Sequence, residues 1–241
     1  MTERSMAPDC PSPIPRAVMR QGWYDIAYVH WRYDPAVVAG LLPPGLEVDT
    51  FDGSAWVGLI PFSMRNIGLP HLPAVPYFGS FPEVNVRTYV IRGGVPGVWF
   101  CSLDINRLAP TIVARTTYRL PYCWGRASHQ RVGRMLTTSV QRRWPSSGPR
   151  TSISIEVGDP IEEPSDLDLF LTARWGLYSR GRAGRLRYAP IDHPRWPLRQ
   201  ATLVDLEDTL VVAAGLPLPT GVPHVCCSDG VSVRVGVPRR V

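Results

Sequence analysis

The sequence predicts a mostly antiparallel β fold of the α+β class, with a few helices at its periphery. The 241 residues include 26 Pro and 21 Gly, a composition that favours short strands and turns over a helical bundle. Several segments alternate apolar and polar side chains with the period of two that strands show. Because many alternating strands must bury their apolar faces, we expect the sheet to close or pack on itself. The length fits a single domain over residues 21–241, preceded by a flexible N-terminal arm of residues 1–20.

Three segments carry helix signals, namely a capping residue or a proline at the start and apolar residues at helical spacing afterwards. The first helix is short and ends at Pro43-Pro44-Gly45. The second runs toward Tyr118, and the third keeps helical spacing as far as Tyr178. They start, in order, at Asp34-Pro35, near Pro110, and at the capping-box pair Ser165 and Asp168.

Strands are predicted between these helices, and the segment 83–91 alternates most strictly. Its valines, at 84, 86 and 90, face one side of the strand. The turn Gly93-Gly94 follows, so residues 83–105 are predicted to form a hairpin. The other clear strand segments are 55–62, 152–157 and 231–237.

The opposite face of the segment 83–91 carries Glu83, Asn85, Arg87 and Tyr89. Such a face is either a solvated outer surface or the wall of a polar cavity. In a cavity, Glu83 could transfer protons, and Arg87 could bind an anion or lower the pKa of Glu83. The polar strand is therefore the first candidate site.

The chain contains no lysine, and all 26 of its basic side chains are arginine. A Schiff base with a carbonyl substrate requires a lysine amine, so this chemistry is excluded. Arginine offers a planar fork of donors to a carboxylate or phosphate. The net charge of +6 is spread along the chain without a basic run, so no nucleic-acid surface is predicted.

Neither the cysteines nor the histidines form a recognisable ligand pattern. The five cysteines have no zinc-site or CxxC spacing, and the five histidines are widely separated. We therefore expect no metal and no other cofactor. The first 20 residues lack the apolar segment of a signal peptide, and no stretch approaches the roughly 20 apolar residues of a membrane-spanning helix. A reduced, cytoplasmic protein without a membrane partner is the expectation.

Long segments of the chain resemble the YqjF-like family (DUF2071-type), whose function is largely uncharacterised and which looks like a branch of the acetoacetate decarboxylase-like superfamily. The resemblance implies a cone-shaped β-barrel around a central cavity, with a few peripheral helices. The segments that carry it run from Tyr28 to Pro35, Leu41 to Asp49, Trp56 to Phe62, Phe81 to Val90, Gly97 to Asp104, Leu120 to Tyr122 and Trp196 to Leu198.

The resemblance also implies roles for individual residues. Arg32, in Trp31-Arg32-Tyr33-Asp34, matches an arginine that binds the substrate carboxylate in the decarboxylases. Glu83 matches an acid/base glutamate, while Tyr122 and Cys123 stand where those enzymes carry lysines. The resulting candidates are Glu83 and Tyr122 for catalysis and Arg32, Arg87, Asp104 and Arg115 for substrate binding.

Two functions follow from these residues. The first is an enzyme of lyase, dehydratase or isomerase type that acts on a small carboxylate- or carbonyl-containing metabolite without Schiff-base chemistry. The alternative is a non-catalytic protein that binds or carries such a molecule. In either case the expected partner is a small, anionic ligand, and the chain is a candidate homo-oligomer.

Overall fold

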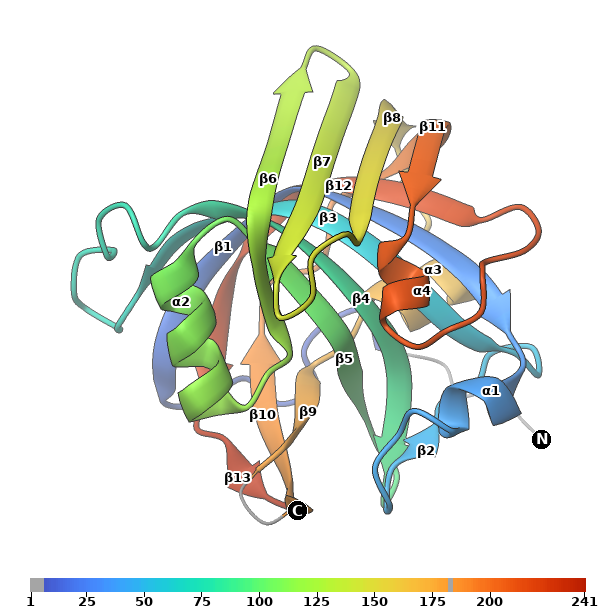
Figure 1. The fold of residues 1–241 in the computed structure, drawn as a ribbon. Coiled ribbons are helices and arrows are strands. Elements are labelled where there is room, and N and C mark those ends of the chain that lie inside the picture. The colour runs from blue at the N-terminus through green and yellow to red at the C-terminus, as the bar shows by residue number, and fades with distance from the viewer. Residues whose placement is uncertain (1–6, 182–183) are drawn as a thin grey trace.

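The computed structural model describes residues 7–181 and 184–241. Its strands account for most of the regular structure and are joined by short helices (Figure 1). The helices are α1 (Pro35–Ala39), α2 (Leu108–Val113), which continues as the π-helical turn η1 (Ala114–Tyr118), α3 (Asp166–Thr172) and α4 (Leu210–Ala213). The strands are β1 (Ala17–Tyr33), β2 (Glu47–Val48), β3 (Ala55–Gly68), β4 (Phe81–Arg92), β5 (Val95–Ile105), β6 (Tyr122–Val132), β7 (Met135–Trp144), β8 (Arg150–Pro160), β9 (Gly176–Arg180), β10 (Leu186–Asp192), β11 (Leu198–Asp208), β12 (His224–Gly236) and β13 (Arg239–Arg240).

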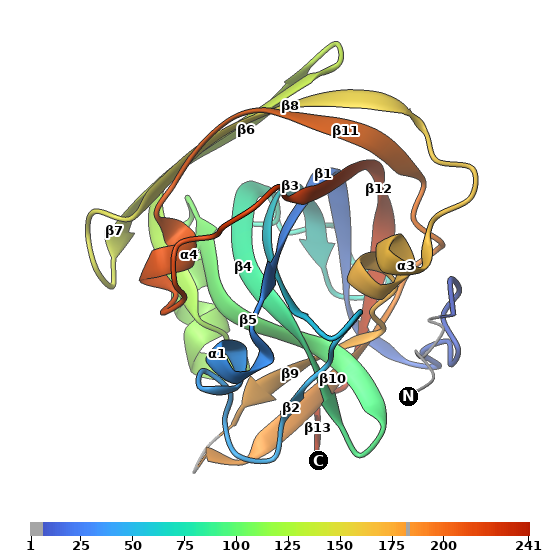
Figure 2. The same ribbon diagram turned by 90° about the vertical axis from the view of Figure 1, so that its right-hand side faces the viewer.

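All the strands belong to one sheet that curves round into a ring (Figure 2). The strand order is β13-β10-β9-β5-β6-β7-β8-β11-β12-β1-β3-β4-β2. Two further pairings, β5 with β4 and β10 with β12, connect distant parts of this order. Most neighbours are antiparallel, and the exceptions described are β5 with β6 and β5 with β9. The predicted mostly antiparallel α+β fold is confirmed.

Strands β1, β3 and β4 form a wall with buried side chains on both faces. Between this wall and β7, β8 and β11 lies an apolar core that includes Val29, Leu59 and Val86. The opposite face contributes Tyr28 and Ile60 to a second apolar cluster, which also takes in residues of β10 and β12. Because apolar clusters cover both sides of this wall, residues 83–90 are buried on both faces of β4. The solvated outer face considered for Glu83 to Tyr89 is therefore wrong.

The predicted strands and hairpin are confirmed, with longer boundaries than the sequence indicated. Strands β4 and β5 pair from Arg92 and Val95 inward. Gly93 and Gly94 both have positive φ, at 53° and 79°, as a two-residue type I′ turn requires. Glycine adopts this conformation without steric cost, so the turn sets the register that aligns β4 with β5.

Two predicted helices are confirmed with small shifts in their bounds. Asp34 caps α1 by accepting the backbone N–H of Ala36 at 2.8 Å. Helix α2 begins at Leu108, slightly before Pro110, and the π-helical turn ends at Tyr118 as expected. Helix α4 is only four residues long and was not predicted. So short an element carries almost no periodicity for a sequence to reveal.

The third helix begins as predicted but ends earlier. Ser165 and Asp168 form the capping box, and α3 then stops at Thr172. The prediction that helical spacing continues to Tyr178 is wrong, because Tyr178 pairs with Trp99 of β5 and Tyr188 of β10 as part of β9. Tertiary pairing outweighs a spacing that also fits a helix.

At the amino end, β1 already begins at Ala17 and pairs with Gly236 of β12. Residues 17–20, which the sequence assigned to the arm, are thus part of the sheet, and residues 1–6 of that arm lie outside the described residues. Within the part of the chain that the structure describes, no helix has the length and apolar character needed to cross a membrane.

Candidate functional site

A cavity of about 460 Å³ lies on the face of the β1–β3–β4 wall that is turned toward β9 and β10. Helix α2, the turn η1, the segment between β3 and β4, and residues of β5, β6 and β12 also contribute to its lining. Most of the lining is apolar, and the polar side chains form a short series on β4 with a few partners opposite. The polar lining residues are Gln21, Glu83, Asn85, Arg87, Tyr118, Tyr122 and Ser179.

Glu83 is a buried carboxyl group in this cavity, with 2% of its surface exposed. The hydroxyl of Tyr122 donates a hydrogen bond to Oε2 of Glu83 at 3.2 Å. Burial raises the pKa of Glu83 to about 8, although hydrogen bonds from Tyr122 and Asn85 oppose the shift and the charge of Asp104 adds to it. At neutral pH the carboxyl group is therefore mostly protonated and can donate a proton into the cavity.

Tyr122 is the first residue of β6, where the chain leaves η1. It pairs in register with Leu103 of β5, and its carbonyl oxygen accepts a hydrogen bond from Nη1 of Arg115 at 2.7 Å. Burial, together with the neighbouring Glu83, raises the pKa of Tyr122 well above its ordinary value. The phenol consequently remains a neutral hydrogen-bond donor.

Arg87 is a buried cation that has no carboxylate partner among the described residues. Its Nη2 donates to the hydroxyl of Tyr89 at 3.2 Å and to the carbonyl of Leu171 at 3.1 Å, and its Nε also reaches the Tyr89 hydroxyl. The aromatic rings of Tyr28 and Tyr89 each lie 5.5 Å from the guanidinium carbon. Nη1 has no hydrogen bond within the described chain. A buried charge held only by neutral groups favours an anionic ligand.

Asn85 lies between these two groups on β4. Its side chain is buried, and Oδ1 has no hydrogen-bond partner within the described chain. Because a buried acceptor without a donor costs free energy, a ligand N–H or O–H opposite Asn85 would be stabilising. The three polar residues Glu83, Asn85 and Arg87 thus offer an acid, an acceptor and a cation in sequence along one strand.

Arg32 does not lie with these residues. Half of its side chain is exposed, and its Nη1 forms an ion pair with Asp52 at 3.0 Å. The guanidinium covers the ring of Trp56 at 4.8 Å, outside the cavity lining. The buried side chains of Trp56 and Tyr89 belong to one apolar cluster, and Arg32 covers the outer side of this cluster. The structure therefore brings Arg87, and not Arg32, to the cavity that contains Glu83.

Asp104 and Arg115 also lie outside the lining. Asp104 is buried in a bidentate ion pair with Arg142, whose Nε and Nη2 each donate at 2.7 Å. Because both of its oxygens accept hydrogen bonds from Arg142, Asp104 stabilises the fold and has no free oxygen for a ligand. Its charge contributes to the raised pKa of Glu83. Arg115 lies 4.6 Å from the ring of Trp144 and holds the backbone of Tyr122. Of the six predicted site residues, the cavity contains Glu83, Arg87 and Tyr122.

The sequence did not identify Gln21, Tyr118 or Ser179 as cavity residues. Each comes from a different segment, and none belongs to a motif, so the sequence offers no signal for them. The sequence also did not predict that Asp168, His224 and Cys226 come together with potential ligand atoms within 4.8 Å of one another. Asp168 accepts from Nε2 of His224 at 2.8 Å and from Ser165 at the start of α3, so these contacts already account for both of its oxygens.

Comparisons with known proteins agree on a family. The sequence profile of DUF2071, described as an uncharacterised conserved protein, matches residues 20–232. The uncharacterised protein YqjF of Bacillus subtilis (strain 168) is 33% identical over 224 residues, which cover 92% of each chain.

Several solved structures have a similar fold. An acetoacetate decarboxylase from Legionella pneumophila is 13% identical, with a TM-score of 0.64 over 96% of this chain and 92% of that one. The enduracididine biosynthesis enzyme MppR complexed with pyruvate is 15% identical, with a TM-score of 0.64 over 95% and 91%. An acetoacetate decarboxylase-like enzyme from Sphingomonas wittichii RW1 is 14% identical, with a TM-score of 0.63 over 96% of each chain. At these identities the likeness shows the fold alone.

Proposed function

The chain belongs to the DUF2071 family and has an acetoacetate decarboxylase-like fold, and from this premise we propose that its cavity binds an organic acid carrying a carbonyl or hydroxyl group and moves a proton on it. The observation that supports the proposal most strongly is that one cavity contains a carboxyl group with a pKa of about 8 and a buried arginine that has no carboxylate partner within residues 7–181 and 184–241. The first can exchange protons near neutral pH, and the second can bind an anion.

The roles follow from the contacts of each group. Arg87 binds the ligand carboxylate through Nη1, while its other nitrogens remain anchored to Tyr89 and Leu171. The ionised fraction of Glu83 removes a proton from the carbon beside the ligand carbonyl to give an enolate, and the carboxyl group formed in this way returns a proton to the same carbon, to a neighbouring carbon or to a leaving hydroxyl. The Tyr122 hydroxyl stabilises the carboxylate form of Glu83 by hydrogen bonding. This chemistry covers enolisation, isomerisation and dehydration. It uses no imine, because the chain contains no lysine.

The apolar character of most of the lining favours a second function, in which the cavity binds the same acid without transforming it. A carrier needs Arg87 and the apolar walls but has no need for the acid of raised pKa. Proton transfer therefore distinguishes the two functions.

The test follows exchange of the hydrogens beside a carbonyl for deuterium in D2O, by proton NMR, over a panel of oxo acids. An enzyme of the proposed type accelerates exchange, and Glu83→Gln abolishes the acceleration while leaving binding intact. Binding without exchange supports the carrier. Arg87→Met should abolish binding, while Arg32→Ala is the matched control and should leave it unchanged, because Arg32 lies outside the cavity. Loss of binding in Arg32→Ala with retention in Arg87→Met would overturn the proposal.

A further inference from the structure

The polar groups of the cavity are too far apart for the smallest oxo acids to contact all of them. Glu83 and Arg87 are four residues apart on β4, and a strand rises roughly 3.4 Å per residue, which gives a Cα separation of about 14 Å. The contacts of Arg87 with Tyr89 and Leu171 direct its guanidinium toward the α3 end of the strand, away from Glu83. A ligand that reaches both residues must therefore be an extended molecule.

The size and walls of the cavity agree with such a ligand. A volume of about 460 Å³ lies in the range of roughly 300–1,000 Å³ that accommodates ligands much larger than a three- or four-carbon acid. Apart from the polar series on β4 and its few partners, the walls are aliphatic and aromatic. They include Phe62, Met64, Phe81, Phe100, Leu103 and Ile191.

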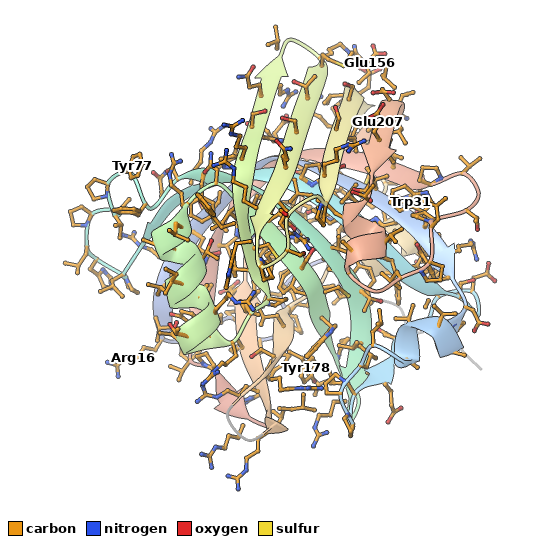
Figure 3. The ribbon with its side chains drawn as sticks, in the orientation of Figure 1. Arg16, Trp31, Tyr77, Glu156, Tyr178 and Glu207 are labelled. Atoms are coloured by element: carbon orange, nitrogen blue, oxygen red, sulfur yellow. The ribbon has the colours of Figure 1, made fainter. Side chains whose placement is uncertain are left out.

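The exposed lining residues identify the entrance. Val75 and Phe78, on the segment between β3 and β4, are 47% and 45% exposed, and Val113 at the end of α2 is 54% exposed. Arg107 joins these two elements, since its Nε donates to the carbonyl of Tyr77 at 3.3 Å. Figure 3 shows Tyr77 on this segment, on the same side of the molecule as α2. Phe81 follows the segment directly, so the order from the entrance inward is Phe81, Glu83, Asn85 and Arg87.

We propose that the ligand is an amphiphilic monocarboxylic acid whose carboxylate binds Arg87, whose hydroxyl or amide N–H donates to Oδ1 of Asn85, and whose alkyl or aryl tail runs past Phe81 to the entrance. This inference rests on the proposed function, because it assigns the substrate class of the same cavity. The 3-hydroxy acids and N-acyl amino acids of about 8–12 carbons have this arrangement of groups, and their length fits the span of the strand.

The experiment measures dissociation constants by isothermal titration calorimetry for straight-chain 3-hydroxy acids of four, six, eight and ten carbons. Each methylene that enters the apolar part of the cavity should tighten binding by about fourfold. The ten-carbon acid without its hydroxyl should bind roughly 3- to 10-fold more weakly, because Asn85 then lacks its donor. The methyl ester of the ten-carbon acid should lose most of its affinity, because the Arg87 charge is unpaired.

Substitutions at the cavity entrance then test whether the alkyl tail of the ligand lies there. Phe78→Asp at the entrance should weaken binding of the ten-carbon acid at least tenfold and that of the four-carbon acid by less than twofold. Val222→Asp is the matched control and should change neither, since Val222 is 96% exposed and does not line the cavity. Melting temperatures of both variants verify folding before titration.

The outcomes separate the inference from the function on which it rests. If short oxo acids bind through Arg87 and exchange their hydrogens in a manner that Glu83→Gln abolishes, but affinity does not increase with chain length, the inference fails and the proposed function stands. If no acid of any length binds in a manner that Arg87→Met or esterification abolishes, the proposed function fails as well. A chain-length dependence that Phe78→Asp removes supports both.

Discussion

Oη of Tyr122 and Oε2 of Glu83 lie 3.2 Å apart, although the two residues are separated by 39 positions in the chain. The contact connects the start of β6 with β4 and places a phenol against a carboxyl group that is 2% exposed. Burial raises the pKa of both groups, so at neutral pH the phenol is neutral and the carboxyl group is mostly protonated. The protonation of this buried pair therefore affects the stability of the folded protein as well as proton transfer in the cavity.

Glu83→Gln should change the pH dependence of stability. The ordinary pKa of a glutamate is 4.5, and burial raises that of Glu83 to about 8. Between these values the unfolded chain releases a proton that the folded protein keeps, so the free energy of unfolding contributed by Glu83 falls as pH rises and levels off above pH 8. Glutamine cannot ionise and removes this decline. Urea unfolding at pH 5, 7 and 9 should show the variant gaining stability relative to the wild type as pH increases.

The control for this measurement is Glu156→Gln, since Glu156 is exposed on β8, at the top of the view in Figure 3, and does not line the cavity. This variant should follow the pH dependence of the wild type. Parallel curves for Glu83→Gln and the wild type would show that Glu83 ionises in the folded protein at an ordinary pKa.

Tyr122→Phe should raise the pKa of Glu83 further. The Tyr122 hydroxyl lowers this pKa by hydrogen bonding to the carboxylate, and phenylalanine removes that effect while retaining the ring. Infrared titration of the protonated carboxyl band should place its disappearance at a higher pH than in the wild type. Tyr33→Phe is the matched control, because the Tyr33 hydroxyl donates to Pro217, outside the cavity. A lower pH for Tyr122→Phe would contradict the donor role.

The sequence predicted the strands well because their period is local. Alternation alone distinguished Val84 and Val86 from Glu83 and Arg87, and Gly93-Gly94 identified the hairpin turn. Alternation cannot decide whether the polar face meets water or a cavity, since that depends on β9 and β10, which are distant in the sequence. Arg32 shows the same limit. A motif places it in the chain, but only the fold shows that its half-exposed side chain pairs with Asp52 and covers the ring of Trp56.

Tyr122 illustrates what a resemblance adds to a pattern. No periodicity singles out this residue, which follows Pro121 at the end of a helical turn. The comparison with lysine positions in the decarboxylases pointed to it, and the structure places its hydroxyl against Glu83. The remaining lining, such as Ser179 and Gln21, comes from isolated positions that neither a pattern nor a motif identifies.

Asp104→Asn should destabilise the protein by about 3–5 kcal/mol, because Arg142 would remain buried without a counter-charge. The side chains of Asp104 and Arg142 are 1% and 4% exposed and share two hydrogen bonds. Asp159→Asn is the matched control and should cost less than about 1 kcal/mol, since Asp159 and Arg134 form an exposed pair at 3.5 Å. Chemical denaturation measures both, and equal effects of the two variants would show that the buried pair is dispensable.

Labelling with N-ethylmaleimide should separate the cysteines by their burial. Cys226 and Cys227 are each 1% exposed, and burial raises the pKa of Cys227 to about 12 and that of Cys226 well above its ordinary value. Both thiols therefore lack the accessible thiolate that reacts, whereas Cys10 is partly exposed. Peptide mass spectrometry at pH 8 should find Cys10 modified first, and Cys226 and Cys227 only when urea unfolds the chain. Cys10→Ser should remove the early modification. Labelling of Cys226 at the rate of Cys10 in the native protein would mean that β12 opens without global unfolding.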